Sequence, residues 1–120
     1  MTFPAIQTIM NAGPVIPVLV IEDIAHARPL AEALVKGGLP VLEVTLRTAC
    51  ALEAIEEMAK VEGGVVGAGT LLKPKDVKAA VKAGARFGVS PGVTRRLAES
   101  CEDHDLPLLE IGRASCRERV

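Results

Sequence analysis

The sequence predicts an α/β fold in which parallel β-strands alternate with helices. Apolar segments of strand length begin roughly every 20–25 residues, and the stretches between them have the periodicity of amphipathic helices. Almost half of the 120 residues are hydrophobic, yet the only aromatic residues are Phe3 and Phe87. A core built from Val, Leu, Ile and Ala is typical of a parallel sheet covered by helices.

Five segments are expected to form the strands of this sheet. Each is short and apolar and is bounded by turn-forming residues, as buried parallel strands are. A short leading helix is expected over residues 4–12. The predicted strands are Val15–Val20, Val41–Leu46, Val65–Ala68, Arg86–Val89 and Leu106–Leu109.

The first long helix is predicted to end near Lys36, where Gly37 and Gly38 stop it. Asp23 is its expected N-cap, because a carboxylate can accept a hydrogen bond from a free backbone N–H of the first turn. Pro29 either interrupts this helix or marks a tighter first turn, and the sequence leaves both open.

Three more helices are predicted in the gaps between the later strands. Thr48 is expected to cap the first of them and Thr94 the last, because a threonine hydroxyl can accept from a first-turn N–H. Pro74 fits the first turn of the middle helix, where its missing N–H costs no hydrogen bond, and Gly84 is expected to end that helix.

Two arrangements of parallel strands fit this alternation: an open doubly wound sheet and a (β/α)8 barrel. Polar residues at the strand ends favour the barrel, because barrel active sites lie at the C-terminal ends of the strands. A complete barrel takes about 200 residues or more. The chain supplies about four βα units and a fifth strand, so we expect a partial TIM barrel.

The segment Val41–Thr48 carries the sharpest functional signal. Side chains alternate along a strand, so Glu43, Thr45 and Arg47 share the face opposite the leucines and Val44. Burying a carboxylate is costly without a partner, which favours a site on the inner side of the sheet. The simpler alternatives are a surface-facing edge strand, or an Arg47 that only neutralises Glu43 as a structural pair.

Composition narrows the function classes. The formal net charge is −1 with both signs interspersed, and aromatic residues are scarce, which argues against a nucleic-acid partner. No apolar run reaches the roughly 18 residues of a membrane span, and the N-terminus lacks the pattern of a secretory signal. Cys50, Cys101 and Cys116 match no metal-binding spacing and fit a reducing cytoplasm, which is the expected location.

Four motifs follow one another in a characteristic order: GPVIPV at Gly13–Val18, VLEVTLRT at Val41–Thr48, GAGT at Gly67–Thr70 and FGVSPG at Phe87–Gly92. Over roughly residues 5–109 the chain resembles the 2-keto-3-deoxy-6-phosphogluconate (KDPG) and 4-hydroxy-2-oxoglutarate (KHG) aldolases. The resemblance implies a class I aldolase on a (β/α)8 barrel, a homotrimer that requires no metal and no cofactor.

The resemblance also implies roles for five residues. Glu43 is similar to the general acid/base that moves protons as the substrate imine forms and the C–C bond breaks. Arg47 and Thr70 are similar to the groups that hold the pyruvyl carboxylate, which a planar guanidinium can bind through two hydrogen bonds. Pro91 lies on the loop that lines the pyruvyl pocket, and Thr45 shares the inward face with a lesser role.

Several of these positions also have simpler interpretations. Thr70 could be only a turn residue after the third strand. Gly67 and Gly69 could cradle a phosphate, although small residues that let a helix or ligand approach the strand explain them better. Pro91 and Gly92 also form a common turn pair.

The Schiff-base lysine of the resembled family has no counterpart in this sequence. In that family it lies on a later strand within a Phe-Lys-Phe-Phe-Pro-like motif, and its amine forms the covalent imine with the substrate ketone. We therefore expect the chain to be inactive or nearly so. The lysines present all fall on predicted helices or their flanks: Lys36, Lys60, Lys73, Lys75, Lys78 and Lys82.

The chain divides into an aldolase-like part, residues 1–109, and a tail, residues 110–120. The tail has neither the strand nor the helix pattern seen upstream. Ile111–Val120 can be encoded by ATC GGA AGA GCG TCG TGT AGG GAA AGA GTG, a string that matches a common sequencing adapter. We expect the tail to be non-native, a translated adapter read, with a natural divergent tail or a frameshift as alternatives.

Three functional hypotheses follow. The first is a truncated aldolase whose parent enzyme cleaves KDPG to pyruvate and glyceraldehyde 3-phosphate, KHG to pyruvate and glyoxylate, or both. The second is a non-catalytic half-barrel module that binds small carboxylates. The third is a different phosphate-binding barrel enzyme with the same βα rhythm.

Overall fold

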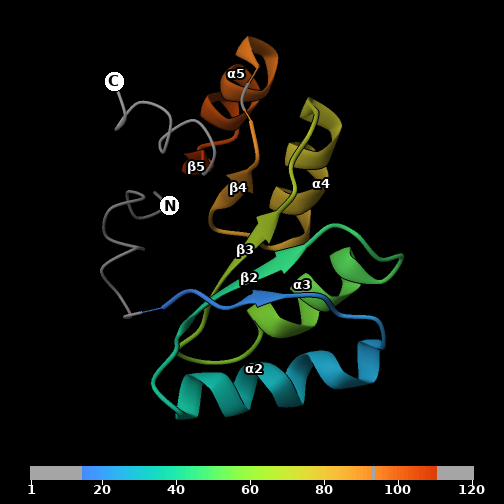
Figure 1. Ribbon diagram of the computed structural model, residues 1–120, viewed down its shortest axis with the longest axis vertical. Helices are drawn as coiled ribbons and strands as arrows, with labels where there is room; N and C mark the ends of the chain where they lie inside the picture. The colour runs from blue at the N-terminus through green and yellow to red at the C-terminus, as the bar shows by residue number, and fades with distance from the viewer. Residues whose placement is uncertain (1–14, 93, 111–120) are drawn as a thin grey trace.

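A computed structural model describes residues 15–92 and 94–110, which form one five-stranded parallel sheet with helices along it (Figure 1). The strands pair in the order in which they occur in the chain. All five lie within or overlap the predicted segments, although several are shorter. They are β1 (Val18–Leu19), β2 (Val41–Thr45), β3 (Val65–Gly69), β4 (Gly88–Ser90) and β5 (Leu108–Glu110).

The shortest strand is β1, which was predicted over Val15–Val20 and spans two residues. It pairs only with β2 among the described strands, through Val18 opposite Glu43 and Leu19 opposite Val44. A strand with one partner has fewer hydrogen bonds to extend it, which explains its length. The helix predicted over residues 4–12 lies outside the described residues.

The helical elements alternate with the strands, as predicted. A 3₁₀ turn precedes the first α-helix, and one α-helix follows each of the strands β2, β3 and β4. They are η1 (Ile24–His26), α2 (Ala27–Lys36), α3 (Ala51–Ala59), α4 (Pro74–Ala83) and α5 (Arg95–Asp103).

The strand order decides between the two predicted architectures. A doubly wound sheet reverses its strand order at a switch point, whereas a barrel adds each new strand beside the previous one. The order β1-β2-β3-β4-β5, all parallel, is that of a barrel. The described residues therefore form a partial (β/α)8 barrel, as the sequence predicted.

The two faces of the sheet have separate cores. Leu42, Val44 and Val66 belong to a large apolar cluster with the buried sides of the helices. The other face carries a smaller cluster of Val41, Phe87 and Val89. The helices thus lie on one side of the sheet, and the opposite side corresponds to the inside of the barrel.

Three of the predicted helix boundaries are confirmed by their caps. The hydroxyl of Thr94 accepts from the backbone N–H of Leu97 at 3.1 Å, as an N-cap does. Pro74 is the first residue of α4, and Gly84 ends that helix at φ 108°, in the left-handed region that glycine adopts without strain. Asp23, the expected N-cap of the first long helix, accepts from Ala25 at 2.9 Å and caps the preceding 3₁₀ turn instead, whereas the N-cap of α2 itself is His26.

Two other helix starts needed the structure. The first helix opens with the 3₁₀ turn, and Pro29 lies in the first turn of α2, so the tighter-first-turn alternative for Pro29 is the observed one. The prediction that Thr48 caps α3 is wrong. The N-cap is Cys50, and the Thr48 hydroxyl donates instead to the carbonyl of Ile21 at 2.6 Å, which ties two loops together.

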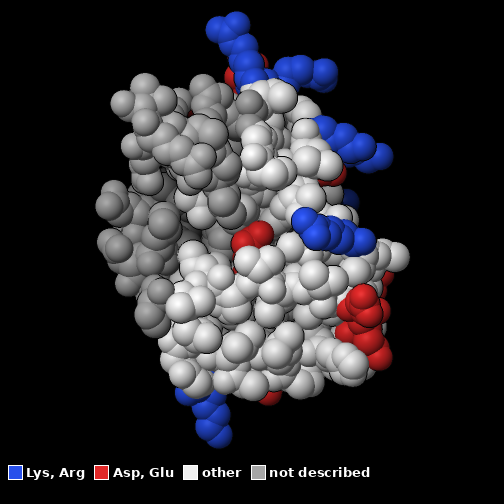
Figure 2. All heavy atoms as spheres, viewed as in Figure 1, with Lys and Arg blue, Asp and Glu red and all other residues white. Residues whose placement is uncertain are grey.

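Charged side chains of the described residues are exposed or half-buried, apart from the buried Glu43. On the face shown in Figure 2, Lys and Arg side chains project singly around the margin, with acidic groups between them. None of the helices in the described residues has the length and apolar character needed to cross a membrane.

Candidate active site

A pocket of about 380 Å³ opens at the C-terminal ends of strands β2, β3 and β4. Barrel enzymes carry their active sites at this end of the strands. All five residues that the sequence singled out line this one pocket, together with two apolar residues. The lining residues are Val18, Glu43, Thr45, Arg47, Thr70, Val89 and Pro91.

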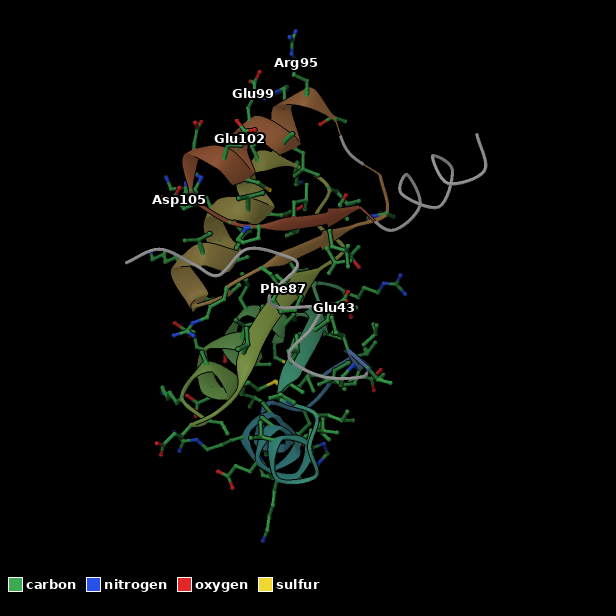
Figure 3. All side chains as sticks on the ribbon, turned by 90° about the vertical axis from the view of Figure 1, so that its left-hand side faces the viewer. Glu43, Phe87, Arg95, Glu99, Glu102 and Asp105 are labelled. Atoms are coloured by element: carbon green, nitrogen blue, oxygen red, sulfur yellow. The ribbon has the colours of Figure 1, made fainter. Side chains whose placement is uncertain are left out.

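Glu43 lies on the inner face of β2, the face of the sheet that also carries the buried ring of Phe87 (Figure 3). Its strand has neighbours on both sides, so the edge-strand alternative is wrong. Only 5% of Glu43 is exposed, and none of the salt bridges among the described residues involves its carboxylate. A buried carboxylate that faces a pocket is suited to exchange protons with a bound ligand.

Burial raises the pKa of Glu43 above its ordinary value of 4.5, because the ionised form loses hydration. The positive charge of Arg47 partly offsets this increase. Of these two effects on the Glu43 pKa, the loss of hydration is the larger. The result is a carboxyl group whose pKa moves towards neutral pH, the direction that favours acid–base chemistry.

Arg47 follows the end of β2 and is exposed. No salt bridge joins it to Glu43, which contradicts the interpretation of the two as a structural pair. An arginine that lines a pocket without this pairing leaves its guanidinium available to an anion. Thr45 is different: it is 4% exposed, and its hydroxyl donates to the carbonyl of Leu19 at 3.2 Å. That bond gives Thr45 a structural task in joining β1 to β2.

Thr70 follows the last residue of β3 and has φ 62°. A β-branched residue rarely adopts this left-handed conformation, which costs roughly 1–2 kcal/mol relative to a right-handed one. A position that needed only this left-handed backbone would favour glycine or asparagine. Thr70 also lines the pocket beside Pro91, so the strained backbone supports a functional role for its side chain.

Ser90 is a supporting residue that the sequence did not single out. It is fully buried, and its hydroxyl donates to the carbonyl of Leu71 at 2.9 Å. The backbone N–H of Gly92 donates to the same hydroxyl at 3.3 Å. Ser90 therefore fixes the turn that carries Pro91 against the segment after Thr70. A serine directly before a Pro-Gly turn was the available signal, but its partner lies 19 residues away in the sequence.

The glycine-rich segment of β3 does not form a phosphate-binding loop. Gly67 lies inside a paired strand, opposite Glu43, rather than in a turn before a helix. A Cβ on Gly67 would overlap the ring of Phe87. Gly67 is therefore better explained as a small residue that leaves space beside the strand. The space is occupied by the side chain of Phe87 rather than by a helix or a ligand.

None of the lysines lines the pocket. Each of them is exposed and lies on α2, α3 or α4 or at the end of one of these helices, as predicted. Across the described residues, no group of three or more His, Cys, Asp or Glu side chains could hold a metal ion. Among its lining residues, the pocket presents a carboxyl group at Glu43 and a guanidinium at Arg47.

Known proteins with the same sequence pattern are aldolases. The family described as "KDPG and KHG aldolase" matches residues 6–114. A 2-dehydro-3-deoxy-phosphogluconate aldolase of Zymomonas mobilis is 62% identical over 94 residues, which are 78% of this chain and 45% of that protein. The KHG/KDPG aldolase of Escherichia coli K12 is 47% identical over 104 residues, covering 86% of this chain and 49% of that protein.

Solved structures agree. The KDPG aldolase of Zymomonas mobilis ATCC 29191 superposes with a TM-score of 0.86 at 56% identity, over 89% of this chain and 52% of that one. The Legionella pneumophila enzyme, with pyruvate captured as a covalent carbinolamine intermediate, gives a TM-score of 0.80 at 46% identity, over 85% of this chain and 50% of that one.

The chain spans about half the length of the curated relatives it matches. These matches favour the first of the three functional hypotheses over a different phosphate-binding barrel enzyme. By sequence and by fold, the chain belongs to the KDPG and KHG aldolase family.

Proposed function

We propose that the protein to which this half-barrel belongs is a class I aldolase. It cleaves KDPG to pyruvate and glyceraldehyde 3-phosphate, KHG to pyruvate and glyoxylate, or both. Family membership supports this reaction class. The observation that carries it for this chain is the buried Glu43 carboxylate, which faces a pocket at the C-terminal ends of the strands together with Arg47 and Thr70.

In this proposal Glu43 transfers protons, and binding of the anionic substrate group is left to other residues. Imine formation requires a proton for the leaving water of the carbinolamine, and C–C cleavage requires removal of a proton from the substrate hydroxyl. A carboxyl group with a raised pKa can serve as the acid in the first step and as the base in the second. The partly apolar pocket walls, Val18 and Val89, restrict the water around it.

Arg47 and Thr70 are proposed to hold the carboxylate of the pyruvyl unit. Arg47 is exposed at the pocket and presents a planar donor group that matches a carboxylate. Thr70 lies across the pocket after β3, and its hydroxyl can donate to the same anion. Pro91, held by Ser90, forms the wall next to them and fits the apolar methyl end of pyruvate.

The chain itself is proposed to bind pyruvate without forming an imine. All of its lysines are exposed on the outer helices or at their ends, and none of them lines the pocket that Glu43 faces. This placement also favours the second functional hypothesis, a non-catalytic half-barrel module that binds small carboxylates. The two readings differ in whether the other half of a barrel, with its lysine, completes the site.

Borohydride trapping tests the proposal. The chain is incubated with ¹³C-labelled pyruvate, reduced, and analysed by mass spectrometry, while NMR follows non-covalent binding. We expect binding that Arg47→Ala weakens and no reduced adduct. The same treatment of the full-length protein should give one adduct, and its aldolase activity should fall with Glu43→Gln. An adduct on the 120-residue chain, or a full-length protein that does not cleave KDPG or KHG, contradicts it.

Further properties of the whole protein are also proposals. We propose a homotrimer in the cytoplasm, with no nucleic-acid or membrane partner and no cofactor; the bacterial metabolic aldolases among the relatives support the location. Light scattering of the full-length protein tests the trimer, and a monomer would contradict it.

For residues 110–120 we propose a non-native origin. Sequencing the locus tests this, and an authentic reading frame through codon 120 would refute it.

A further inference from the structure

Gly69 has no conformational reason to be glycine. It is the last residue of β3 and pairs in register with Thr45 of β2. Among the described residues, the glycines with positive φ are Gly38, Gly63 and Gly84, so Gly69 has a backbone that other residues adopt. Glycine in a strand is unfavourable unless something else needs the space.

The space at Gly69 is occupied by the side chain of Glu43. A Cβ at position 69 would overlap Oε1 of Glu43, and it would lie 2.9 Å from Cδ and 3.1 Å from Cγ of the same residue. All three of its nearest neighbours thus belong to Glu43. The glutamate crosses from β2 over the adjacent strand, and its carboxylate rests on the bare backbone of Gly69.

We propose that Gly69 is a positioning residue that sets where the Glu43 carboxylate lies in the pocket. Any side chain at position 69 would occupy this slot and force the carboxylate elsewhere. The role of the slot in catalysis rests on the proposed function of Glu43, whereas the slot itself rests on geometry alone.

Gly67 provides a natural comparison on the same strand. Side chains at positions 67 and 69 would both point to the inner face, because residues two apart in a strand share a face. A Cβ at position 67 would overlap the ring of Phe87 instead of Glu43. The two glycines therefore make room for different side chains, an apolar ring and a carboxylate.

A double-mutant cycle tests the inference without any need for activity. Gly69→Ala, Glu43→Ala and the double variant are compared with the original 120-residue chain by urea unfolding. Gly69→Ala should lower the unfolding midpoint, and the same substitution in the Glu43→Ala background should cost little, because the overlapping side chain is gone. If Gly69→Ala alone does not fold, Glu43→Ala should restore folding.

Gly67→Ala is the matched control, because its overlap is with Phe87. Its cost should change much less than that of Gly69→Ala when Glu43→Ala is added. A penalty for Gly69→Ala that is equally large in both backgrounds, or a double variant that stays unfolded, would overturn the inference.

A second readout addresses positioning rather than stability. The titration of the Glu43 carboxyl group, followed by ¹³C NMR, should move back towards the ordinary range of glutamate in Gly69→Ala, because the displaced group gains hydration. Gly67→Ala should leave this titration closer to that of the original chain. An unchanged Glu43 titration in Gly69→Ala would also refute the role. Failure of the proposed aldolase reaction, in contrast, would leave the cycle and the titration as expected.

Discussion

Replacing Ser90 by alanine should loosen the turn that forms one wall of the pocket. The hydroxyl of this fully buried residue donates to the carbonyl of Leu71 at 2.9 Å and accepts from the N–H of Gly92 at 3.3 Å. A buried carbonyl that loses its donor costs about 1–3 kcal/mol. The Gly92 N–H can donate to water instead, because this glycine is exposed, so its lost hydrogen bond adds little to the cost. The expected loss in the free energy of unfolding is therefore about 1–3 kcal/mol.

Urea denaturation measures this loss directly. With a denaturant dependence of about 1–3 kcal/mol per molar, the unfolding midpoint should fall by on the order of 1 M. Ser100→Ala is the control, since Ser100 is a buried serine within α5, where alanine is a good helix former. Pyruvate binding should weaken in Ser90→Ala and stay unchanged in Ser100→Ala. A Ser90→Ala midpoint equal to that of the original chain would show that the hydroxyl does not support the turn.

The remaining predictions concern the other pocket residues. Because burial raises the pKa of Glu43, its protonated form favours folding. The stability of the original chain, measured relative to that of Glu43→Gln, should therefore be highest below pH 4.5 and should decrease as pH rises through the folded pKa, as thermal melts over a pH series would detect. Arg47→Lys should weaken pyruvate binding roughly tenfold in NMR titrations while stability changes by less than about 0.5 kcal/mol, since a lysine offers no two-pronged carboxylate contact and the residue is exposed. Thr70→Asn should stabilise the chain by about 1 kcal/mol in urea melts by relieving the backbone at φ 62°, yet reduce pyruvate affinity; a loss of stability would refute the strain.

The parts of this fold that follow from local pattern were predictable. Alternation alone placed Glu43 and Arg47 on the face opposite Leu42, and the structure has them there. The caps at Thr94 and Gly84 were also predictable, because each depends on residues within one helical turn. An arrangement that depends only on residues close together in the sequence can be predicted from that stretch of sequence alone.

Contacts between distant segments were not predictable in the same way. Thr48 is a residue type that often caps helices, but its hydroxyl donates to a carbonyl 27 residues earlier instead of accepting from a first-turn N–H, and tertiary packing decides between these two partners. The partner of Ser90 is similarly remote. The absence of a Glu43–Arg47 ion pair depends on side-chain directions that a strand pattern does not specify.

The sheet has two edges whose backbone hydrogen-bonding groups have no partner strand in the described residues. At one edge β1 pairs only with β2, and at the other β5 pairs only with β4. In a complete (β/α)8 cylinder, such as the one proposed for the full-length protein, further strands pair with both of these edges. The boundary after β5 is therefore a suitable place to divide such an enzyme into two genes. Reassembly of the two polypeptides would bring the proposed Schiff-base lysine to the Glu43 carboxylate, so that the recovery of turnover would report on their association.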